Sequence, residues 1–373
     1  MTGNDRITAM QALEFLRDYQ KRVAFHYQKL FKKWQLLASR ARKVNRLLMA
    51  KFFDLYPRGK QHRGALAVLG YELAGGKDKE DILKASIMIE LMETSILIAD
   101  DVIDLDERRR GVATIHKQWE AKIKDQSRRS VGTKIKNDEA RHFGESMAQI
   151  TSIIGFHLAP WVLLQTKFSD LIKTKALNFY NESLIETGWG EALDVASSWQ
   201  KFKDKQNSAG LIHDYKTVHY SSVLPLKFGA ILAGTEPGVW LSSLEKYAVA
   251  LGRIFQIQDD IIGSFGNPKV TGKANDNDIK EGRWTMLMEI LWARADREDK
   301  SIIKQILSGS KRTAIEVSKI KKLMEKYGAV AQAQKRAQNY LKEGLELIPK
   351  LTKGREAQET LENLLRFMLE RKR

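Results

Sequence analysis

The clearest chemistry in the sequence lies in an acidic cluster that follows an apolar stretch. Asp100, Asp101 and Asp104 end the apolar run that begins near residue 81. On a helix, Asp100 and Asp104 share one face, where their carboxylates repel each other unless a cation lies between them. Oxygen ligands of this kind suit Mg²⁺, which is usually completed by waters and substrate phosphates. The cluster predicts a Mg²⁺ site for a phosphorylated substrate, although a solvated helix end would have the same composition.

A second stretch repeats this pattern and strengthens the functional interpretation. Asp259 and Asp260 also end an apolar, helix-like stretch. Arg109 and Arg110 follow the first cluster and offer fixed N–H donors for phosphate oxygens. Acidic groups for a metal and basic groups for a phosphate, at the end of an apolar helix, suit a ligand with an ionised head and an apolar tail.

The motifs and their order resemble the trans-isoprenyl diphosphate synthases of the polyprenyl synthetase family. The resemblance begins near residue 57 and continues to the C-terminus. It includes Gly59, Lys60 and Arg63 upstream, the segment from Gly190 to Asp194, Lys216 and Thr217, Lys273, and Arg371 in the basic C-terminus. It implies an all-α helical bundle around an apolar cavity, and a homodimer.

The resemblance also implies the reaction and the roles of the residues. The reaction is head-to-tail prenyl transfer, in which isopentenyl diphosphate condenses with an allylic diphosphate in the presence of a cluster of three Mg²⁺ ions. The implied metal ligands are Asp100, Asp101, Asp104, Asp259 and Asp260. The implied catalytic residues are Asp100, Asp104, Asp259, Lys216, Thr217 and Gln256. The implied substrate-binding residues are Gly59, Lys60, Arg63, Arg109, Arg110, Lys273 and Arg371.

The sequence departs from the family pattern at several positions. Gly263 replaces the third aspartate of the second motif, and Gln61 replaces the first arginine of the upstream motif. Ser152 and Ile153 stand where the family has Gly-Asp. Glu93 stands where the family usually has His or Gln near isopentenyl diphosphate. A carboxylate there would repel a diphosphate unless it pairs with a neighbouring cation.

The residues before Asp100 bear on the length of the product. Relatives that make the C15 product carry bulky aromatics four and five residues before the first aspartate, where this chain has Ile96 and Ser95. Met92 and Met88 are the next side chains along the helix that could close the pocket, and methionine makes a soft floor. We expect a C20 product, geranylgeranyl diphosphate, with C25 or longer as the second choice.

Composition agrees with a large helical protein. The chain has 373 residues, six prolines, no cysteine and a net charge of +17. Apolar residues recur at helical spacing and strand-like alternation is scarce, which predicts an all-α fold. The lack of cysteine favours a reducing compartment. There is no signal-peptide pattern or long apolar run, and we expect a soluble, cytoplasmic protein.

Residues 1–56 form a basic amphipathic extension before the synthase domain of residues 57–373. Between Asp18 and Asp54 there is no acidic residue, while ten lysines and arginines occur. The favoured interpretation is core-packing helices with a solvated basic face. The alternative is peripheral contact with an anionic membrane, to which a lipid product would be delivered.

Residues 118–139 are polar and charged, and we expect an inserted loop there. The loop is favoured over a nucleic-acid patch, because the segment has little aromatic interleaving beyond Trp119. Nearby, an apolar helix over residues 144–164 should break at Pro160, and a helix over residues 217–232 should kink at Pro225.

Three other functions compete with prenyl transfer. A terpene cyclase of the same fold would not need Lys60, Arg63 or the paired arginines. An inactive relative would typically have lost aspartates of the first motif, which this chain keeps. A non-catalytic basic helical protein that binds membrane or nucleic acid would leave the repeated paired aspartates unexplained.

Overall fold

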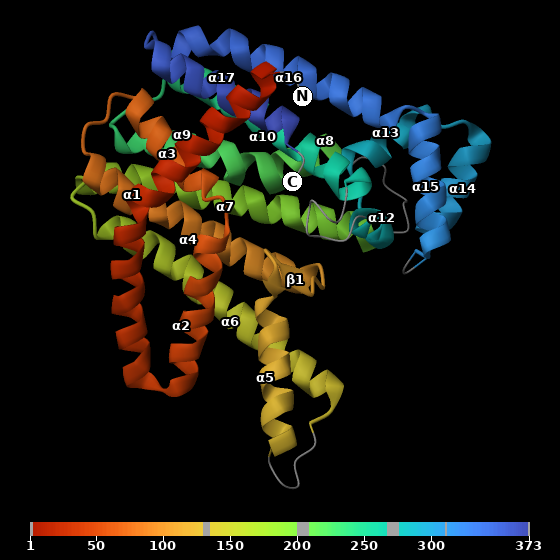
Figure 1. Cartoon of the computed structure of the whole chain (residues 1–373), viewed down its shortest axis with the longest axis horizontal. Helices are drawn as coiled ribbons and strands as arrows, with labels where there is room; N and C mark the ends of the chain where they lie inside the picture. Colours follow the sequence, from red (N-terminus) through yellow and green to blue (C-terminus); the bar gives the residue numbers. More distant parts are fainter. Residues whose placement is uncertain (1–2, 130–134, 200–208, 267–275, 310–311, 372–373) are drawn as a thin grey trace. The chain divides into compact units, whose positions relative to one another are not determined.

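The computed structural model describes residues 3–129, 135–199, 209–266, 276–309 and 312–371, which fall into two compact units (Figure 1). The first-motif unit comprises residues 16–69 and 76–174 and contains Asp100. The second-motif unit comprises the residues up to 15, residues 70–75 and the residues from 175 onward, and contains Asp259. Three helices contribute residues to both units: α1 (Gly3–Ala41), α3 (His62–Leu73) and α7 (Asp170–Trp199).

The first-motif unit is almost entirely helical, which confirms the predicted all-α class for this part of the chain. Its remaining elements are α2 (Lys43–Leu55), the 3₁₀ helix η1 (Tyr56–Arg58), α4 (Lys79–Ile103), β1 (Arg108–Arg109), β2 (Val112–Ala113), α5 (Ile115–Arg129) and α6 (Asn137–Leu164).

Helix α4 is the element that positions the first acidic motif. The Asp78 carboxylate caps its start by accepting from the backbone N–H groups of Glu80 and Asp81 at 3.1 and 2.9 Å. From residue 81 to residue 95 its side chains are almost all buried, and α6 packs along it. The helix ends at Ile103 with Asp104 as its C-cap. A rigid, buried helix therefore presents the aspartates at its C-terminal end.

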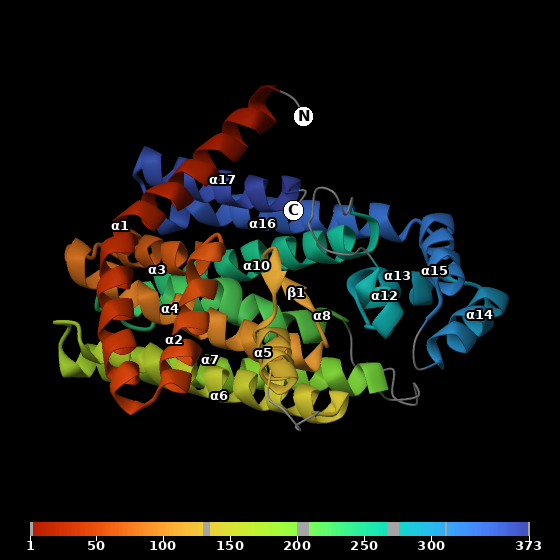
Figure 2. The same cartoon turned by 60° about the horizontal axis from the view of Figure 1, so that its bottom comes forward.

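Helices α1 and α2 form an antiparallel hairpin (Figures 1 and 2), as expected for a helical extension over residues 1–56. The Tyr27 ring stacks on Tyr56 at 3.8 Å, and its hydroxyl donates to the carbonyl of Phe53. At the tip of the hairpin, residues 39–46 are all exposed. The base of the hairpin is thus packed, whereas the tip carries its basic residues into solvent.

The predicted loop over residues 118–139 is wrong for the residues that the structure describes. Residues 118–129 continue helix α5, and residues 137–139 start α6. Trp119 is buried in α5, and Gly144 lets α6 approach so closely that a Cβ there would lie 2.4 Å from the carbonyl oxygen of His116. Packing against α6 stabilises a helix whose charged composition alone suggests a loop.

Pro160 does not break α6, contrary to the expectation from sequence. The helix runs to Leu164, so Pro160 lies in its last turns and removes only one backbone hydrogen bond near the end. Contrary to the expectation from sequence, α6 is long and apolar enough to cross a membrane by length and composition alone. Core helices of soluble proteins pass the same test, and α6 packs against α4 and α5.

The second-motif unit is helical in all its described elements. Apart from the shared helices, these are α8 (Ala209–His213), the π-helix η2 (Asp214–Val223), α9 (Leu224–Leu232), α10 (Val239–Phe265), α12 (Asn277–Glu281), α13 (Met286–Arg294), α14 (Arg297–Leu307), α15 (Ala314–Lys326), α16 (Ala329–Leu351) and α17 (Arg355–Glu370).

Helix α10 lies at the centre of this unit, packed against α16, α17 and η2 (Figure 1). Tyr247 in its middle is fully buried and donates to the carbonyl of Leu361 at 2.8 Å. The predicted kink at Pro225 is instead a change of helix type, because the π-helix η2 ends at Val223 and α9 follows with the proline in its first turn. Because η2 and α9 follow each other without a break, Pro225 removes one hydrogen bond from a continuous helix, and the π-helical turns before it are the local adjustment.

Candidate functional site

The first acidic motif brings two of its three carboxylates together. Asp100 and Asp104 offer oxygen atoms that lie within 4.8 Å of each other, and both side chains are half-buried at the end of α4. This is the arrangement that the four-residue spacing predicts. Two adjacent hard oxygen donors, still accessible, fit a Mg²⁺ ion that keeps several waters.

Asp101 points elsewhere and holds Arg109. Its carboxylate is 1% exposed and accepts from Arg109 Nε, while Arg109 Nη2 donates to Asp100 at 3.0 Å and to Asp106 at 3.3 Å. Burial raises the pKa of Asp101 to about 6, although the neighbouring guanidinium opposes the rise. Arg109 therefore acts in this structure as a counter-ion that fixes the aspartates of the motif.

Arg110 is presented by a tight turn between β1 and β2. Arg110 and Gly111 both have left-handed φ values, 50° and 81°, as a two-residue hairpin turn of the I′ type requires. The Arg110 guanidinium donates to the carbonyl of Leu55 at 3.2 Å. A Cβ at Gly59 would lie 2.5 Å from the same guanidinium, so a larger residue there would displace the end of this flexible side chain. Gly59 thus lies beside one of the arginines that the resemblance implies for substrate binding.

Glu93 pairs with neighbouring cations, which is the condition under which a carboxylate at this position would not repel a diphosphate. Its Oε1 accepts from Arg63 Nη1 at 2.5 Å and from Arg110 Nη2 at 3.0 Å. The carboxylate therefore pairs with two of the residues that the resemblance implies for substrate binding. Lys60, another of these residues, is exposed, and its carbonyl accepts from Gln20 at 3.1 Å.

Glu90 belongs to the same region and was missed from the sequence. It is 2% exposed, one turn before Glu93, and accepts from the backbone N–H of Gly64 at 2.6 Å. Burial and the Glu93 charge raise its pKa, whereas Arg63 and Arg110 outweigh burial and lower that of Glu93. The available signal was a second glutamate at i−3 in an otherwise apolar helix.

Three of the predicted pocket residues continue the α4 helix back from the aspartates. Ile96 is half-buried one turn before Asp100 on the same face, and Met92 and Met88 are fully buried further back. An aliphatic side chain of moderate size therefore stands nearest to the first aspartate.

Ser95 lies on a different side of α4. Its carbonyl accepts from the Ser152 hydroxyl of α6 at 2.8 Å, and a Cβ at Gly155 would lie 2.2 Å from its Oγ. Ser95 thus packs tightly against α6. Ser152, a departure from the family pattern, has a structural role in this contact.

In the second-motif unit, the two paired aspartates have different environments. Asp260 is 3% exposed and accepts from Gln256 Nε2 at 2.9 Å, from the N–H of Met286 at 2.8 Å and from His213 at 3.3 Å. Asp259 is more open, and its Oδ1 pairs with Arg371 Nη2 at 2.8 Å. Asp259 is thus the accessible ligand, while Asp260 fixes the start of α13.

Arg371 and Gln256 therefore have observed partners. The Arg371 guanidinium also lies over the Phe255 ring at 4.2 Å, so α10 holds the C-terminal arginine by charge and by cation–π contact. Gln256 donates to Asp260, a contact that would orient the amide for any further role.

Lys216 is held by the Gly190–Asp194 segment of α7. Its Nζ lies 2.5 Å from Asp194 Oδ2 and 3.0 Å from Glu191 Oε2. A Cβ at Gly190 would lie 2.2 Å from the Lys216 backbone nitrogen, so glycine allows α7 to approach η2. Lys216 and the half-buried Thr217 both lie in the π-helix, a distortion that often marks functional sites.

Asp278 lies next to Gly263, the position at which the family carries the third aspartate of the second motif. A Cβ added at Gly263 would lie 2.8 Å from Asp278 Oδ2, and Arg283 lies 3.8 Å from the other carboxylate oxygen. Burial raises the pKa of Asp278 to about 6, although Arg283 opposes the rise. A carboxylate from α12 therefore stands beside the position of the missing third aspartate. Lys273 lies outside the described residues.

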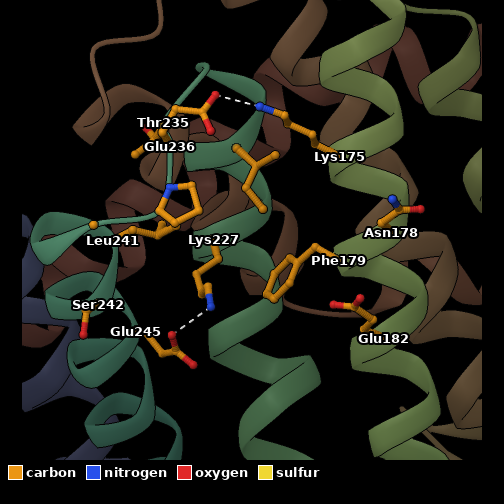
Figure 3. A pocket seen from close by; sticks show the side chains of 13 residues that line it. Lys175, Asn178, Phe179, Glu182, Lys227, Thr235, Glu236, Leu241, Ser242 and Glu245 are labelled. Carbon is orange, nitrogen blue, oxygen red and sulfur yellow. Dashed lines mark hydrogen bonds and ion pairs between the residues drawn. The ribbon is translucent and has the colours of Figure 1, made fainter.

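A separate pocket of the second-motif unit contains none of these residues. It has a volume of about 520 Å³ and is lined by α7, α9 and α10 (Figure 3). Two lysines face it, but Lys175 pairs with Glu236 at 2.6 Å and Lys227 pairs with Glu245 at 2.8 Å. Both lysines are thus paired with carboxylates, and the pocket shares no lining residue with the acidic motifs.

The helical fold, with paired aspartates at the ends of two long helices and basic donors beside them, defines an isoprenoid synthase-type protein. Residues 45–327 match the polyprenyl synthetase family, and the chain belongs to this family. It is a prenyltransferase, and the resemblance to trans-isoprenyl diphosphate synthases is confirmed.

Its relatives differ in the product that they are named for. A short chain isoprenyl diphosphate synthase of Methanothermobacter thermautotrophicus is 29% identical over 87% of this chain and 90% of its own length. A farnesyl pyrophosphate synthase of Schizosaccharomyces pombe is 28% identical over 66% of each chain. The crystal structure of a geranylgeranyl pyrophosphate synthase from Corynebacterium glutamicum, complexed with isoprenyl diphosphate and magnesium, matches with a TM-score of 0.82 at 24% identity and covers 96% of this chain and 98% of its own.

Proposed function

We propose that the chain catalyses Mg²⁺-dependent condensation of isopentenyl diphosphate with an allylic diphosphate and that its main product is the C20 compound, geranylgeranyl diphosphate. The observation that carries the proposal is the end of α4, where Asp100 and Asp104 place carboxylate oxygens within 4.8 Å of each other on the face that continues to Ile96. One face of α4 thus carries the metal-binding carboxylates at its end and apolar side chains directly before them.

The residues divide the work of the reaction. Asp100 and Asp104 would hold Mg²⁺ in the first-motif unit, and Asp259 is the accessible carboxylate that would do so in the second-motif unit. Bound Mg²⁺ would neutralise the allylic diphosphate and make it a better leaving group. Lys216, oriented by Asp194, supplies a further positive charge. Lys60, Arg63 and Arg110 would receive the diphosphate of isopentenyl diphosphate.

The bond changes balance without an outside reactant. The allylic C–O bond breaks to give a carbocation and free diphosphate, and the double bond of isopentenyl diphosphate forms the new C–C bond. A proton then leaves to the departing diphosphate. The apolar side chains of α4 exclude water, which would otherwise quench the cation.

The C20 assignment is supported by the side chains nearest to Asp100. No aromatic residue occurs from Asp81 to Asp100, and Ile96 leaves more room than a phenylalanine would. The test is incubation with Mg²⁺, labelled isopentenyl diphosphate and C5, C10 or C15 primers, followed by sizing of the products. A main product of C15, or no transfer with any primer, would reject the proposal.

A terpene cyclase, the alternative that the sequence raised, would ionise the same allylic substrate. Lys60, Arg63 and Arg110 argue against it, since a cyclase has no second diphosphate to bind. The same incubation separates the two functions: a cyclase would release diphosphate from the allylic substrate alone and would not incorporate labelled isopentenyl diphosphate.

We also propose that the tip of the α1–α2 hairpin contacts anionic membrane. Leu36, Leu37 and Val44 are 58%, 39% and 43% exposed there, next to Arg40 and Arg42, which matches a surface that combines apolar and cationic contacts.

The test is co-sedimentation with anionic vesicles, and salt should weaken binding because it screens the charges. R40E/R42E should reduce binding, whereas K319E/K322E on exposed residues of α15 should not. Equal binding to neutral and anionic vesicles would reject this contact.

A homodimer in the cytoplasm completes the proposal. Exposed apolar side chains such as Ile150 and Ile153 on α6, which are 46% and 56% exposed, are suitable for a subunit interface. Light scattering of the purified chain tests the oligomeric state, and cell fractionation tests the compartment.

A further inference from the structure

Four ionisable side chains meet inside the first-motif unit and include none of the acidic-motif aspartates. They form the arginine–glutamate cluster, which consists of Arg63, Glu90, Glu93 and Arg110. Arg63, Glu90 and Glu93 are 4%, 2% and 5% exposed. Arg63 and Arg110 come from different elements, yet both guanidinium groups donate to the same oxygen of Glu93, at 2.5 and 3.0 Å.

The backbone around the cluster is held in unusual conformations. Gln61 has a φ of 52° and Arg110 a φ of 50°, and neither is a glycine. A non-glycine residue in the left-handed region costs on the order of a kcal/mol and is typically retained where function requires it. Here the two conformations lie next to the arginines that converge on Glu93. The convergence therefore depends on backbone geometry that the fold maintains at a cost.

We infer that Glu93 competes internally with isopentenyl diphosphate for Arg63 and Arg110 and thereby sets the affinity of the enzyme for that substrate. The inference rests on the proposed function, which assigns this diphosphate to the two arginines. Carboxylate and phosphate oxygens use the same guanidinium N–H donors. An incoming diphosphate must therefore displace the Glu93 carboxylate or bind beside it.

Binding beside the carboxylate requires that its charge be neutralised. Two like charges in a buried site repel each other strongly, so proton uptake by the ionised Glu93 would accompany binding. The titratable and charged groups that face the two glutamates are Tyr19, Tyr56, His62, Arg63 and Arg110. The affinity for the diphosphate should therefore decrease as pH rises, and the decrease should exceed the effect of the diphosphate's own titration.

The test compares the wild type with Glu93→Gln, which keeps the shape and removes the charge. The KM for isopentenyl diphosphate should fall about tenfold, which corresponds to about 1.4 kcal/mol, while the KM for the allylic diphosphate stays the same. Glu80→Gln is the matched control, because Glu80 lies in the same helix and pairs with His26 and Lys84 at the surface. The control should leave both KM values unchanged.

A binding measurement separates this inference from the proposed function. Calorimetry with inorganic pyrophosphate in the absence of Mg²⁺ needs no turnover. Glu93→Gln should bind pyrophosphate more tightly than the wild type and with a weaker dependence on pH between 6 and 8. Absence of transfer by the wild type would reject the proposed function only.

The inference itself has a clear contrary result. If Glu93→Gln binds pyrophosphate no more tightly than the wild type, and only its melting midpoint falls, Glu93 merely neutralises buried arginines and the competition does not exist. If the glutamine variant does not fold, Glu93→His, which introduces a residue type typical of the family at this position, allows the same comparison.

Discussion

The most informative perturbation is Gly263→Asp, which restores the third aspartate that the family carries in the second motif. From the sequence alone, this change should improve metal binding. The structure predicts the opposite, because a Cβ at this position lies 2.8 Å from Asp278 Oδ2, well inside the 3.4 Å at which ordinary contact begins. The space that the new side chain needs is already occupied by a carboxylate.

The size of the effect follows from charge and contact. Two carboxylates about 4 Å apart repel each other by about 4 kcal/mol at an effective dielectric constant of about 20, and Arg283 at 3.8 Å offsets part of this repulsion. We expect Gly263→Asp to lower kcat/KM for the allylic diphosphate about tenfold or more. Asp278→Ala should lower it as well, because it removes the carboxylate that stands beside the motif.

The double variant Gly263→Asp/Asp278→Ala provides the decisive comparison. It should recover much of the lost activity, since one carboxylate again stands near the end of the motif, and the two changes should couple by more than about 1 kcal/mol. The assay is steady-state transfer of labelled isopentenyl diphosphate over a Mg²⁺ titration. Gly188→Asp on α7 is the control, because no atom lies within 4 Å of its added Cβ.

Two results would refute this reasoning. One is a Gly263→Asp enzyme that is more active than the wild type while Asp278→Ala is unchanged. The other is a double variant that is no better than the worse single variant. In either case Asp278 would not substitute for the missing aspartate.

Three further predictions concern the first-motif unit. Asp100→Ala should lower turnover at least about a hundredfold with little change in the melting midpoint, because it removes a metal ligand at a half-buried helix end; near-normal activity over a Mg²⁺ titration would contradict this. Ile96→Phe should shift the sized products toward C15, whereas Ser95→Phe should mainly lower the melting midpoint, by overpacking worth about 1–3 kcal/mol, since Ser95 packs against α6; a clean C15 shift in Ser95→Phe alone would reverse the assignment. Finally, folded Glu90 has a pKa of about 8, so between pH 4.5 and 8 it holds a proton that the unfolded chain has released, and the stability of the fold decreases as pH rises through this range. Glu90→Gln should therefore reduce the decrease in melting midpoint between pH 6 and 8. An unchanged decrease would argue against the buried proton.

The sequence by itself determined the helical class, the family and the pair on α4. Asp100 and Asp104 are four residues apart in an apolar helix, and helical geometry places residues at this spacing on one face. The sequence also identified Gly59 as part of the upstream motif and Gly190 as part of the Gly190–Asp194 segment. Such features depend on short-range periodicity and local chemistry, which the order of residues specifies directly.

Only the tertiary structure decided which charged groups pair with which. Glu93 is close to Arg63 and Arg110 because a left-handed turn and a separate helix bring the arginines to α4. Asp278 comes to lie beside Gly263 for a similar reason, as residues 15 apart in sequence are brought together by the packing of α12 on α10.

The prediction of a loop over residues 118–139 was wrong for α5 because it, too, depends on tertiary contacts. The charged residues of α5 suggested a loop because their composition offers little apolar surface for a helix on its own. Contact with α6 through Trp119 and Gly144 supplies what the local sequence lacks. Burial of this kind depends on a partner distant along the chain, so it is visible only once the chain has folded.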